Sequence, residues 1–242
     1  AANLGSMATP IGNPQNLYIS SVAGLTMGQF ARATLPYAAL SLALLLAALR
    51  FRRDEPLDGE LLAGEVPPPA PLSALAPFLL LLLLCLMVVL RVLPYLPVLL
   101  CVAAVVFAVD RRLFRSVDYF LLLTFLCFFV FIGNLKRIPA LNGLLLSLVG
   151  GHELPAGILA SQVISNVPAA ILLSGFTENY SALLTAVNLG GLGTLIASLA
   201  SLIAFKFYAA AYPDRKGAFL RQFTLWNAAF LAVLTAAALI LG

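Results

Sequence analysis

The chain has 242 residues, of which 62% are hydrophobic and only 10% are charged, and its mean hydropathy is +1.03. A soluble domain of this length could not bury so much apolar surface, so the composition is that of an integral membrane protein. The net charge of +4 is small and lies in predicted loops, which excludes a nucleic-acid-binding surface. The three cysteines stand alone in apolar runs, which excludes a zinc site or a disulfide framework.

The first 51 residues are predicted to form a broken helix followed by a long one. Pro10 and Pro14 prevent a regular helix around Gly12-Asn13, because proline lacks the N–H that an interior helical position needs. A membrane-spanning helix is then predicted at about residues 27–51.

Residues 52–73 are the one clearly aqueous segment. Five acidic residues precede three consecutive prolines, Pro67-Pro68-Pro69. We expect a solvated cytoplasmic linker between two helical blocks.

The middle block, residues 74–153, is mostly plain apolar helix. Ser116 is predicted to be the N-cap of its third span. The predicted elements are two closely spaced spans at about 74–92 and 95–109, a span at about 117–135, and a short amphipathic segment at 140–150.

Residues 155–175 have a polar centre between two apolar arms. Each arm is too short to cross a membrane, since a spanning helix needs about 20 residues. A re-entrant hairpin with Ser165-Asn166 at its tip is therefore predicted.

A second broken helix is predicted at about 180–211, before a final span at about 219–241. Gly190, Gly191 and Gly193 interrupt it, because each glycine costs a helix about 1 kcal/mol relative to alanine. An unwound backbone at membrane depth is tolerated only where it faces buried protein or a wet cavity.

The two predicted breaks repeat the same sequence pattern. Ala1 to Asn13 aligns with Ala186 to Ser198 at a constant offset of 188 − 3 = 185 residues. The identical pairs are Ala1/Ala186, Asn3/Asn188, Leu4/Leu189, Gly5/Gly190, Thr9/Thr194 and Ile11/Ile196. Interrupted apolar segments at corresponding places in two halves indicate the binding site of a secondary transporter.

The repeated pattern occurs only in the outer blocks. Residues 1–51 and 154–242 are therefore predicted to form a transport unit, and residues 74–153 a static, dimer-forming scaffold. Positively charged loops favour the cytoplasm. The clusters expected there are Arg50, Arg52 and Arg53; Arg111, Arg112 and Arg115; and Arg215, Lys216 and Arg221.

The hairpin tip and the two breaks form the candidate site. Amide, hydroxyl and unwound carbonyl oxygens can ligate Na⁺ without a permanent charge in the membrane, and helix N-termini beside them favour an anionic substrate. The alternative is that small and polar residues only permit close helix packing. The occurrence of two copies in register favours the ion site.

His152-Glu153 could be a proton relay, since ionisable groups inside a membrane are usually functional. Their position between Gly151 and Pro155 favours a solvated loop instead. No acidic residue lies in the middle of a predicted span, unlike in proton antiporters, which generally rely on such a carboxylate.

At these residues the chain resembles the ion transporter superfamily. Its members include divalent-anion/sodium symporters, citrate carriers, arsenite efflux permeases and some Na⁺/H⁺ antiporters, and the likeness is closest to a bacterial anion permease of the citrate/dicarboxylate type. The resemblance rests on Asn3-Leu4-Gly5, Thr9 to Asn16, Ser165-Asn166 and Asn188-Leu189-Gly190.

The resemblance implies an all-α polytopic transporter with inverted repeats, re-entrant hairpins and broken helices. It also implies a homodimer whose transport domains move by an elevator motion. Only the second half of that fold is complete in this sequence. We therefore expect the first repeat to be truncated, with its hairpin absent.

Carried onto this chain, the resemblance implies one cation site at the second hairpin and part of another at the first break. The residues expected to bind the cation are Ser165, Asn166, Gly193, Thr194, Gly5, Thr9, Gly12 and Asn13.

The residues expected to bind substrate are Asn166, Val167, Pro168, Asn13, Pro14 and Asn188. The chain departs from the family pattern at two of the site positions. Val167 stands where dicarboxylate carriers have a threonine that touches the substrate carboxylate, and Ser165 stands where arsenite-type and antiporter members often have an aspartate.

The sequence therefore predicts a multi-pass protein of the cytoplasmic (inner) membrane that moves an anion such as citrate or a dicarboxylate, coupled to Na⁺ or H⁺. The alternatives are a Na⁺/H⁺ antiporter or arsenite-type efflux permease and, in a different class, a non-transporting membrane scaffold. No intramembrane pair of catalytic groups supports an enzyme. The expected partners are the small anion, the bilayer and a second copy of the chain, and no cofactor is expected beyond the coupling Na⁺.

Overall fold

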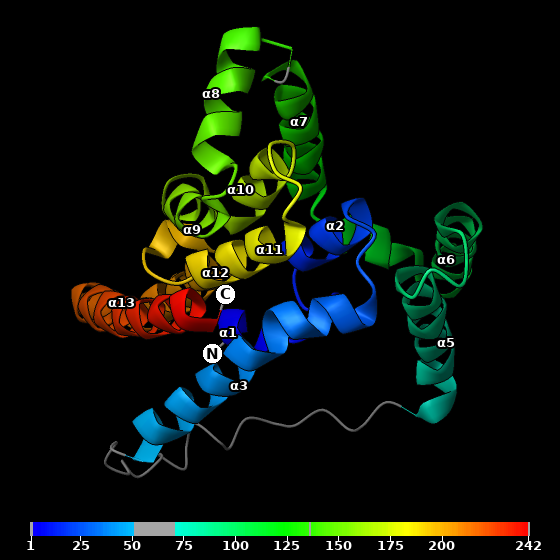
Figure 1. Ribbon diagram of the computed structural model, residues 1–242. Coiled ribbons are helices and arrows are strands. Elements are labelled where there is room, and N and C mark those ends of the chain that lie inside the picture. Colours follow the sequence, from blue (N-terminus) through cyan, green and yellow to red (C-terminus); the bar gives the residue numbers. More distant parts are fainter. Residues whose placement is uncertain (1, 51–70, 136, 242) are drawn as a thin grey trace. The chain divides into compact units, whose positions relative to one another are not determined.

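The computed structural model describes residues 2–50, 71–135 and 137–241, all of whose regular elements are helices (Figure 1). The α-helices are α1 Ala2–Ser6, α2 Pro14–Val22, α3 Met27–Arg50, α5 Leu72–Val89, α6 Tyr95–Asp110, α7 Tyr119–Leu135, α8 Pro139–Val149, α9 Glu153–Ile164, α10 Asn166–Leu173, α11 Tyr180–Gly190, α12 Leu199–Ala211 and α13 Lys216–Leu241. Three short 3₁₀ helices accompany them, η1 Arg111–Ser116, η2 Leu195–Ala197 and η3 Pro213–Arg215.

The chain folds as two compact units, one of residues 1–50 with 121–242 and the other of residues 51–120. Most of the linker expected at 52–73 lies outside the described residues. The first unit contains both broken helices and the hairpin. The division into a moving and a static part remains a prediction.

Most predicted elements are confirmed, but the cap proposed for the third middle span is wrong. α7 begins at Tyr119, whereas Ser116 is the last residue of η1. The reason is local, because Val117 after η1 is extended, with φ −71° and ψ 131°, and separates Ser116 from α7.

The helices α3 and α13, the latter with the 3₁₀ turn before it, are long and apolar enough to cross a membrane. Helices α7 and α8 are bent by 103° relative to each other, and together they would make a third span if the bent pair crosses the membrane as a single element. α5 and α6, with 18 and 16 residues, are shorter than the roughly 20 residues of a typical span, and their crossing remains a prediction.

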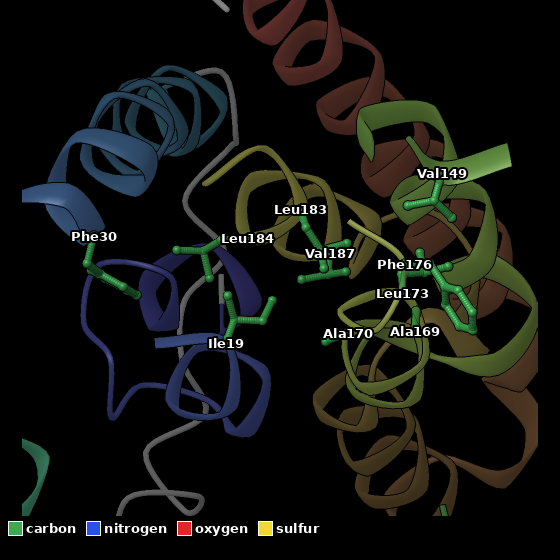
Figure 2. Packing of buried hydrophobic residues seen from close by; sticks show 10 residues of the cluster. All are labelled: Ile19, Phe30, Val149, Ala169, Ala170, Leu173, Phe176, Leu183, Leu184 and Val187. Atoms are coloured by element: carbon green, nitrogen blue, oxygen red, sulfur yellow. The ribbon is translucent and has the colours of Figure 1, made fainter. Parts of the chain in front are cut away.

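The core of the first unit surrounds α11. Eight of its eleven residues are buried, so this helix is covered on every side, which is the environment that an apolar helix without a polar face requires. Figure 2 shows Leu183, Leu184 and Val187 of α11 between Ile19 and Phe30 on one side and the residues of α10 on the other. This packing fixes the end of α11, where the second break begins.

Candidate functional site

The two breaks have the same backbone plan. α2 begins at Pro14 and α12 at Leu199, which is the same offset of 199 − 14 = 185 residues that relates the two sequence motifs. The N-cap residues correspond as well. Asn13 accepts a hydrogen bond from the backbone N–H of Asn16 at 3.0 Å, and Ser198 accepts one from that of Ala200 at 3.2 Å.

Side chains of the two breaks are hydrogen-bonded crosswise. Asn13 donates to Asn188 Oδ1 at 3.1 Å, and the corresponding Ser198 donates to Asn3 Oδ1 at 2.6 Å. Each bond thus joins an N-cap of one copy to the asparagine of the other. The two interrupted segments are therefore held against each other by a pair of equivalent contacts.

A second pair of bonds follows the same correspondence. Asn188 donates to Asn16 Oδ1 at 2.6 Å, and Asn3 donates to Ser201 Oγ at 3.5 Å, where 16 + 185 = 201. Asn3 also donates to the carbonyl of Gly191 at 2.9 Å. Asn13 and Asn188, expected to contact substrate, thus use their carboxamides on each other and on Asn16.

The hairpin turns at one strained residue. Ser165 has φ 73° and ψ 153° between α9 and α10, a conformation that side-chain-bearing residues rarely adopt. Strain of this kind costs about 1–3 kcal/mol and is concentrated at functional sites. The Ser165 hydroxyl is 3.4 Å from the carbonyl oxygen of Ala197, so the tip of the hairpin lies beside the second break.

Gln162 clamps the unwound backbone of the second break. Its Nε2 donates to the carbonyls of Gly190 at 2.8 Å and Leu192 at 2.9 Å, and its Oε1 accepts from the N–H of Thr194 at 2.9 Å. One carboxamide thus satisfies three backbone groups that the interrupted helix leaves without intrahelical partners.

The three glycines of the second break each make room for one polar side chain of the hairpin. A methyl group on Gly190 would lie 2.6 Å from Ser161 Oγ, and one on Gly191 would lie 2.8 Å from Asn166 Nδ2. Gly193, which also has φ +101°, would bring its methyl group within 2.5 Å of Gln162 Oε1. These glycines therefore permit close approach as well as interrupting the helix.

The site residues of the first break are less enclosed. Gly5 has no atom within 4 Å of its missing side chain and borders an apolar groove of about 460 Å³ between α1 and α3, whereas its counterpart Gly190 is covered by the hairpin. A side chain on Gly12 would overlap the carbonyl of Ser6. The carbonyl of Thr9 accepts from the N–H of Gly12 at 3.1 Å, and Pro14 is the first residue of α2.

The remaining predicted residues lie in or after the hairpin. Val167 and Pro168 are buried in α10, and Val167 packs with Ile132 and Ile171 in an apolar cluster. The hydroxyl of Thr194 donates to the backbone carbonyl of Gln162 at 3.4 Å. The structure thus brings Ser165, Asn166 and the second break together.

Two buried carboxamides are exceptions to this pattern of pairing. Asn166 and Gln15 are 3% and 2% exposed, and no hydrogen bond reaches either side chain from the described part of the chain. Asn166 is the first residue of α10 and Gln15 is the second of α2, two helices that pack against each other. An amide that the surrounding chain leaves unpaired can take a hydrogen-bond partner from a ligand or from water.

Four of these polar side chains were not predicted from the sequence to be site residues. Asn3, Gln15 and Asn16 stand within or beside the first motif, and Gln162 stands four residues before Asn166. Their signal was a carboxamide inside an otherwise apolar run. Spacing alone gave no sign that Gln162 reaches a segment 28–32 residues further along the chain.

Glu153 is the first residue of α9, at the start of the hairpin, and its carboxylate is hydrogen-bonded. Its carboxylate accepts from the hydroxyl of Thr177 at 2.7 Å and from the N–H of Gly151 at 3.2 Å. Burial acts to raise the pKa of Glu153, but these hydrogen bonds and the adjacent His152 hold the pKa below its usual value. The carboxylate therefore stays charged at neutral pH, which disfavours the proton-relay alternative.

An all-helical chain with spanning helices, two broken helices and a hairpin that closes on one of them is built as a membrane transporter. Residues 1–182 match the citrate transporter family (CitMHS), and the chain belongs to that family.

Two curated relatives agree with this assignment. The chain is 37% identical over 212 residues to the "Inner membrane protein YbiR" of Escherichia coli K12, covering 85% of this chain and 56% of that protein. It is 34% identical over 218 residues to the "Uncharacterized transporter MJ0456" of Methanocaldococcus jannaschii, covering 85% of this chain and 55% of that protein. The chain thus spans about half the length of the curated relatives that it matches, and no solved structure matches it.

The Gln162 clamp predicts that Gln162→Leu destabilises the first unit by about 1–3 kcal/mol, because three backbone groups lose their partner. The measurement is thermal or denaturant unfolding in detergent. Gln222→Leu, at an exposed position on α13, is the matched control and should change stability by less than about 0.5 kcal/mol. Equal stability of the two variants would show that water replaces the clamp.

The glycine contacts predict a difference between equivalent positions. Gly190→Ala should cost about 1–3 kcal/mol of unfolding free energy, because its methyl group meets Ser161 and the backbone carbonyl of Gly157. In this chain Gly5→Ala meets open space and should be neutral or stabilising by up to about 1 kcal/mol. Equal effects of the two substitutions on the unfolding midpoint would refute the close-approach role.

Proposed function

We propose that this chain is part of a secondary active transporter of the inner membrane that moves a small anion, such as citrate or a dicarboxylate, with Na⁺ as the coupling ion. Membership of the citrate transporter family supports a permease. The anion and the coupling ion are proposed from the arrangement of groups at the hairpin tip, and the elevator motion from the resemblance to the ion transporter superfamily.

The observation that carries the proposal is the unpaired carboxamide of Asn166. It is buried, lies against Gly191 and has no hydrogen-bond partner among the described residues, while Asn16, Asn188 and Gln162 are all engaged. A carboxamide offers an oxygen to a cation and an N–H to an anion. A bound ion and substrate would supply the partners that the chain does not.

An anion is favoured by the helix N-termini at this place. The first residues of α10, α2 and α12 lie by the breaks, since Asn166 abuts Gly191, Asn13 contacts Asn188 and Ser198 contacts Asn3. Each N-terminus presents the positive end of a helix dipole, although the caps Asn13 and Ser198 already engage the N–H groups of Asn16 and Ala200. Gln15, buried and unpaired in the first turn of α2, adds a second amide to this anion site.

We propose that the cation binds at the second break, beside Asn166 and apart from the anion at the helix N-termini. Gln162 and Asn3 already occupy the carbonyls of Gly190, Gly191 and Leu192, so these oxygens are weak candidates. The oxygens that we propose for Na⁺ are Ser165 Oγ, Asn166 Oδ1, the Gly193 carbonyl and Thr194 Oγ1. All are neutral, which suits a monovalent cation held near the middle of a membrane.

The antiporter and arsenite-type alternatives have less support. The motifs at the hairpin tip and at both breaks contain no aspartate or glutamate, so the site lacks a carboxylate that could exchange a proton. We further propose that residues 1–51 and 154–242 move together and that the scaffold at 74–153 forms the homodimer.

The first test is Asn166→Ala in the complete natural protein, reconstituted in liposomes. Stability should be nearly unchanged, because the deleted amide makes no hydrogen bond within the described chain. Na⁺-dependent citrate or dicarboxylate uptake should need about tenfold more Na⁺ or more, with substrate affinity falling in parallel because coupling is reciprocal.

Asn134→Ala, exposed on α7, is the control for this experiment and should transport like the parent protein. Unchanged uptake and unchanged Na⁺ dependence in Asn166→Ala, for every anion that the parent carries, would make the hairpin tip structural and overturn the site.

The strained residue at the tip allows a second test. Ser165→Gly and Ser165→Ala both remove the hydroxyl, so both should raise the Na⁺ concentration needed for half-maximal uptake. Only Ser165→Gly should raise the unfolding midpoint, by the equivalent of about 1 kcal/mol or more, because glycine adopts φ 73° without strain. A normal Na⁺ dependence in both variants would remove Ser165 from the cation site.

A further inference from the structure

The second unit has a pocket of its own at the end of α6. It has a volume of about 800 Å³ and lies within residues 51–120. Its lining consists of three arginines and three aromatic residues. The lining residues are Phe107, Arg111, Arg112, Phe114, Arg115 and Tyr119.

The local fold gathers the arginines. Asp110 ends α6, and its carboxylate accepts from the backbone N–H of Arg112 at 3.0 Å, which starts the 3₁₀ helix η1. Residues three apart in a 3₁₀ helix lie above one another, so Arg112 and Arg115 share one side of η1. Their like charges repel each other, and an anion bound between them would offset that repulsion.

The chain itself does not supply that anion. All three arginines are exposed, and no salt bridge joins them to a carboxylate among the residues that the structure describes. The neighbouring carboxylate of Asp110 is engaged at the helix end. The guanidinium groups are therefore free to form the paired hydrogen bonds that suit phosphate oxygens.

The surroundings favour a lipid over a soluble anion. α6 has no charged residue between Tyr95 and Val109, and Phe107 and Tyr119 are 66% and 55% exposed. An apolar helix that ends in aromatic rings and then in arginines is typical of the boundary between hydrocarbon and headgroups. The exposed leucines of α6, Leu96, Leu99 and Leu100, would lie along the acyl chains.

We propose that this pocket binds the phosphate of an anionic phospholipid in the cytoplasmic leaflet, with Arg111, Arg112 and Arg115 on the headgroup and the aromatic rings on the first part of the acyl chains. Each arginine near an anionic surface contributes attraction that weakens with salt. The site is independent of the transport site proposed above.

The test uses the full chain purified in detergent and stripped of lipid. The triple variant Arg111→Gln/Arg112→Gln/Arg115→Gln is compared with the control Arg215→Gln/Lys216→Gln/Arg221→Gln, which loses the same charge in the other unit. Retained lipid is measured by mass spectrometry, and binding by the shift of the unfolding midpoint on titration with phosphatidylglycerol, phosphatidylcholine or inorganic phosphate.

The parent and the control should bind phosphatidylglycerol at least tenfold more tightly than the triple variant does, and the difference should shrink at high salt. Phosphatidylcholine and inorganic phosphate should bind the parent weakly. If the control loses as much phosphatidylglycerol binding as the triple variant, the effect is one of net charge alone. If inorganic phosphate binds as tightly as phosphatidylglycerol, the pocket is a site for a soluble anion. Either result overturns the proposal.

If the triple variant does not fold, the single variants Arg112→Gln and Arg115→Gln replace it, with Arg215→Gln as their control. Each should weaken phosphatidylglycerol binding at least threefold. Unchanged binding in both single variants also overturns the proposal.

Discussion

The whole site depends on one requirement, that an unwound backbone in apolar surroundings must still have its carbonyl and amide groups paired. The chain meets this requirement with side-chain carboxamides brought from elsewhere. Gln162 serves the second break from the hairpin, and Asn3 serves it from the first break. The interruption of the helix is thus possible because two other segments of the chain, the hairpin and the first break, supply partners for it.

The same requirement explains why the polar side chains divide into two groups. Asn3, Asn13, Asn188 and Gln162 are used to hold the breaks and the hairpin together, and they leave few free atoms for ligands. Asn166 stands apart because its carboxamide is buried but unpaired. The asparagines of these motifs therefore differ in role, and only geometry separates those that hold the fold from Asn166, which we propose binds a ligand.

Local rules predicted the elements well and the contacts poorly. The offset of 185 residues anticipated both breaks, and the polar centre of residues 155–175 anticipated a turn at Ser165. Both signals are short-range, since prolines, glycines and polar residues act within a few positions. The clamp by Gln162 could not be predicted, because it depends on how α9 packs against α11. Ser116 was misassigned because cap preference does not reveal that a 3₁₀ turn ends there.

The crosswise pairs also limit how the two copies of the motif can diverge. Asn13 and its counterpart Ser198 differ in length, and each must still reach an asparagine that belongs to the other copy. The shorter serine reaches its asparagine as well as the longer side chain does, with bonds of 2.6 Å from Ser198 and 3.1 Å from Asn13. Since each copy of the motif supplies the partner for the other, a substitution at any of these positions removes a contact from both copies at once.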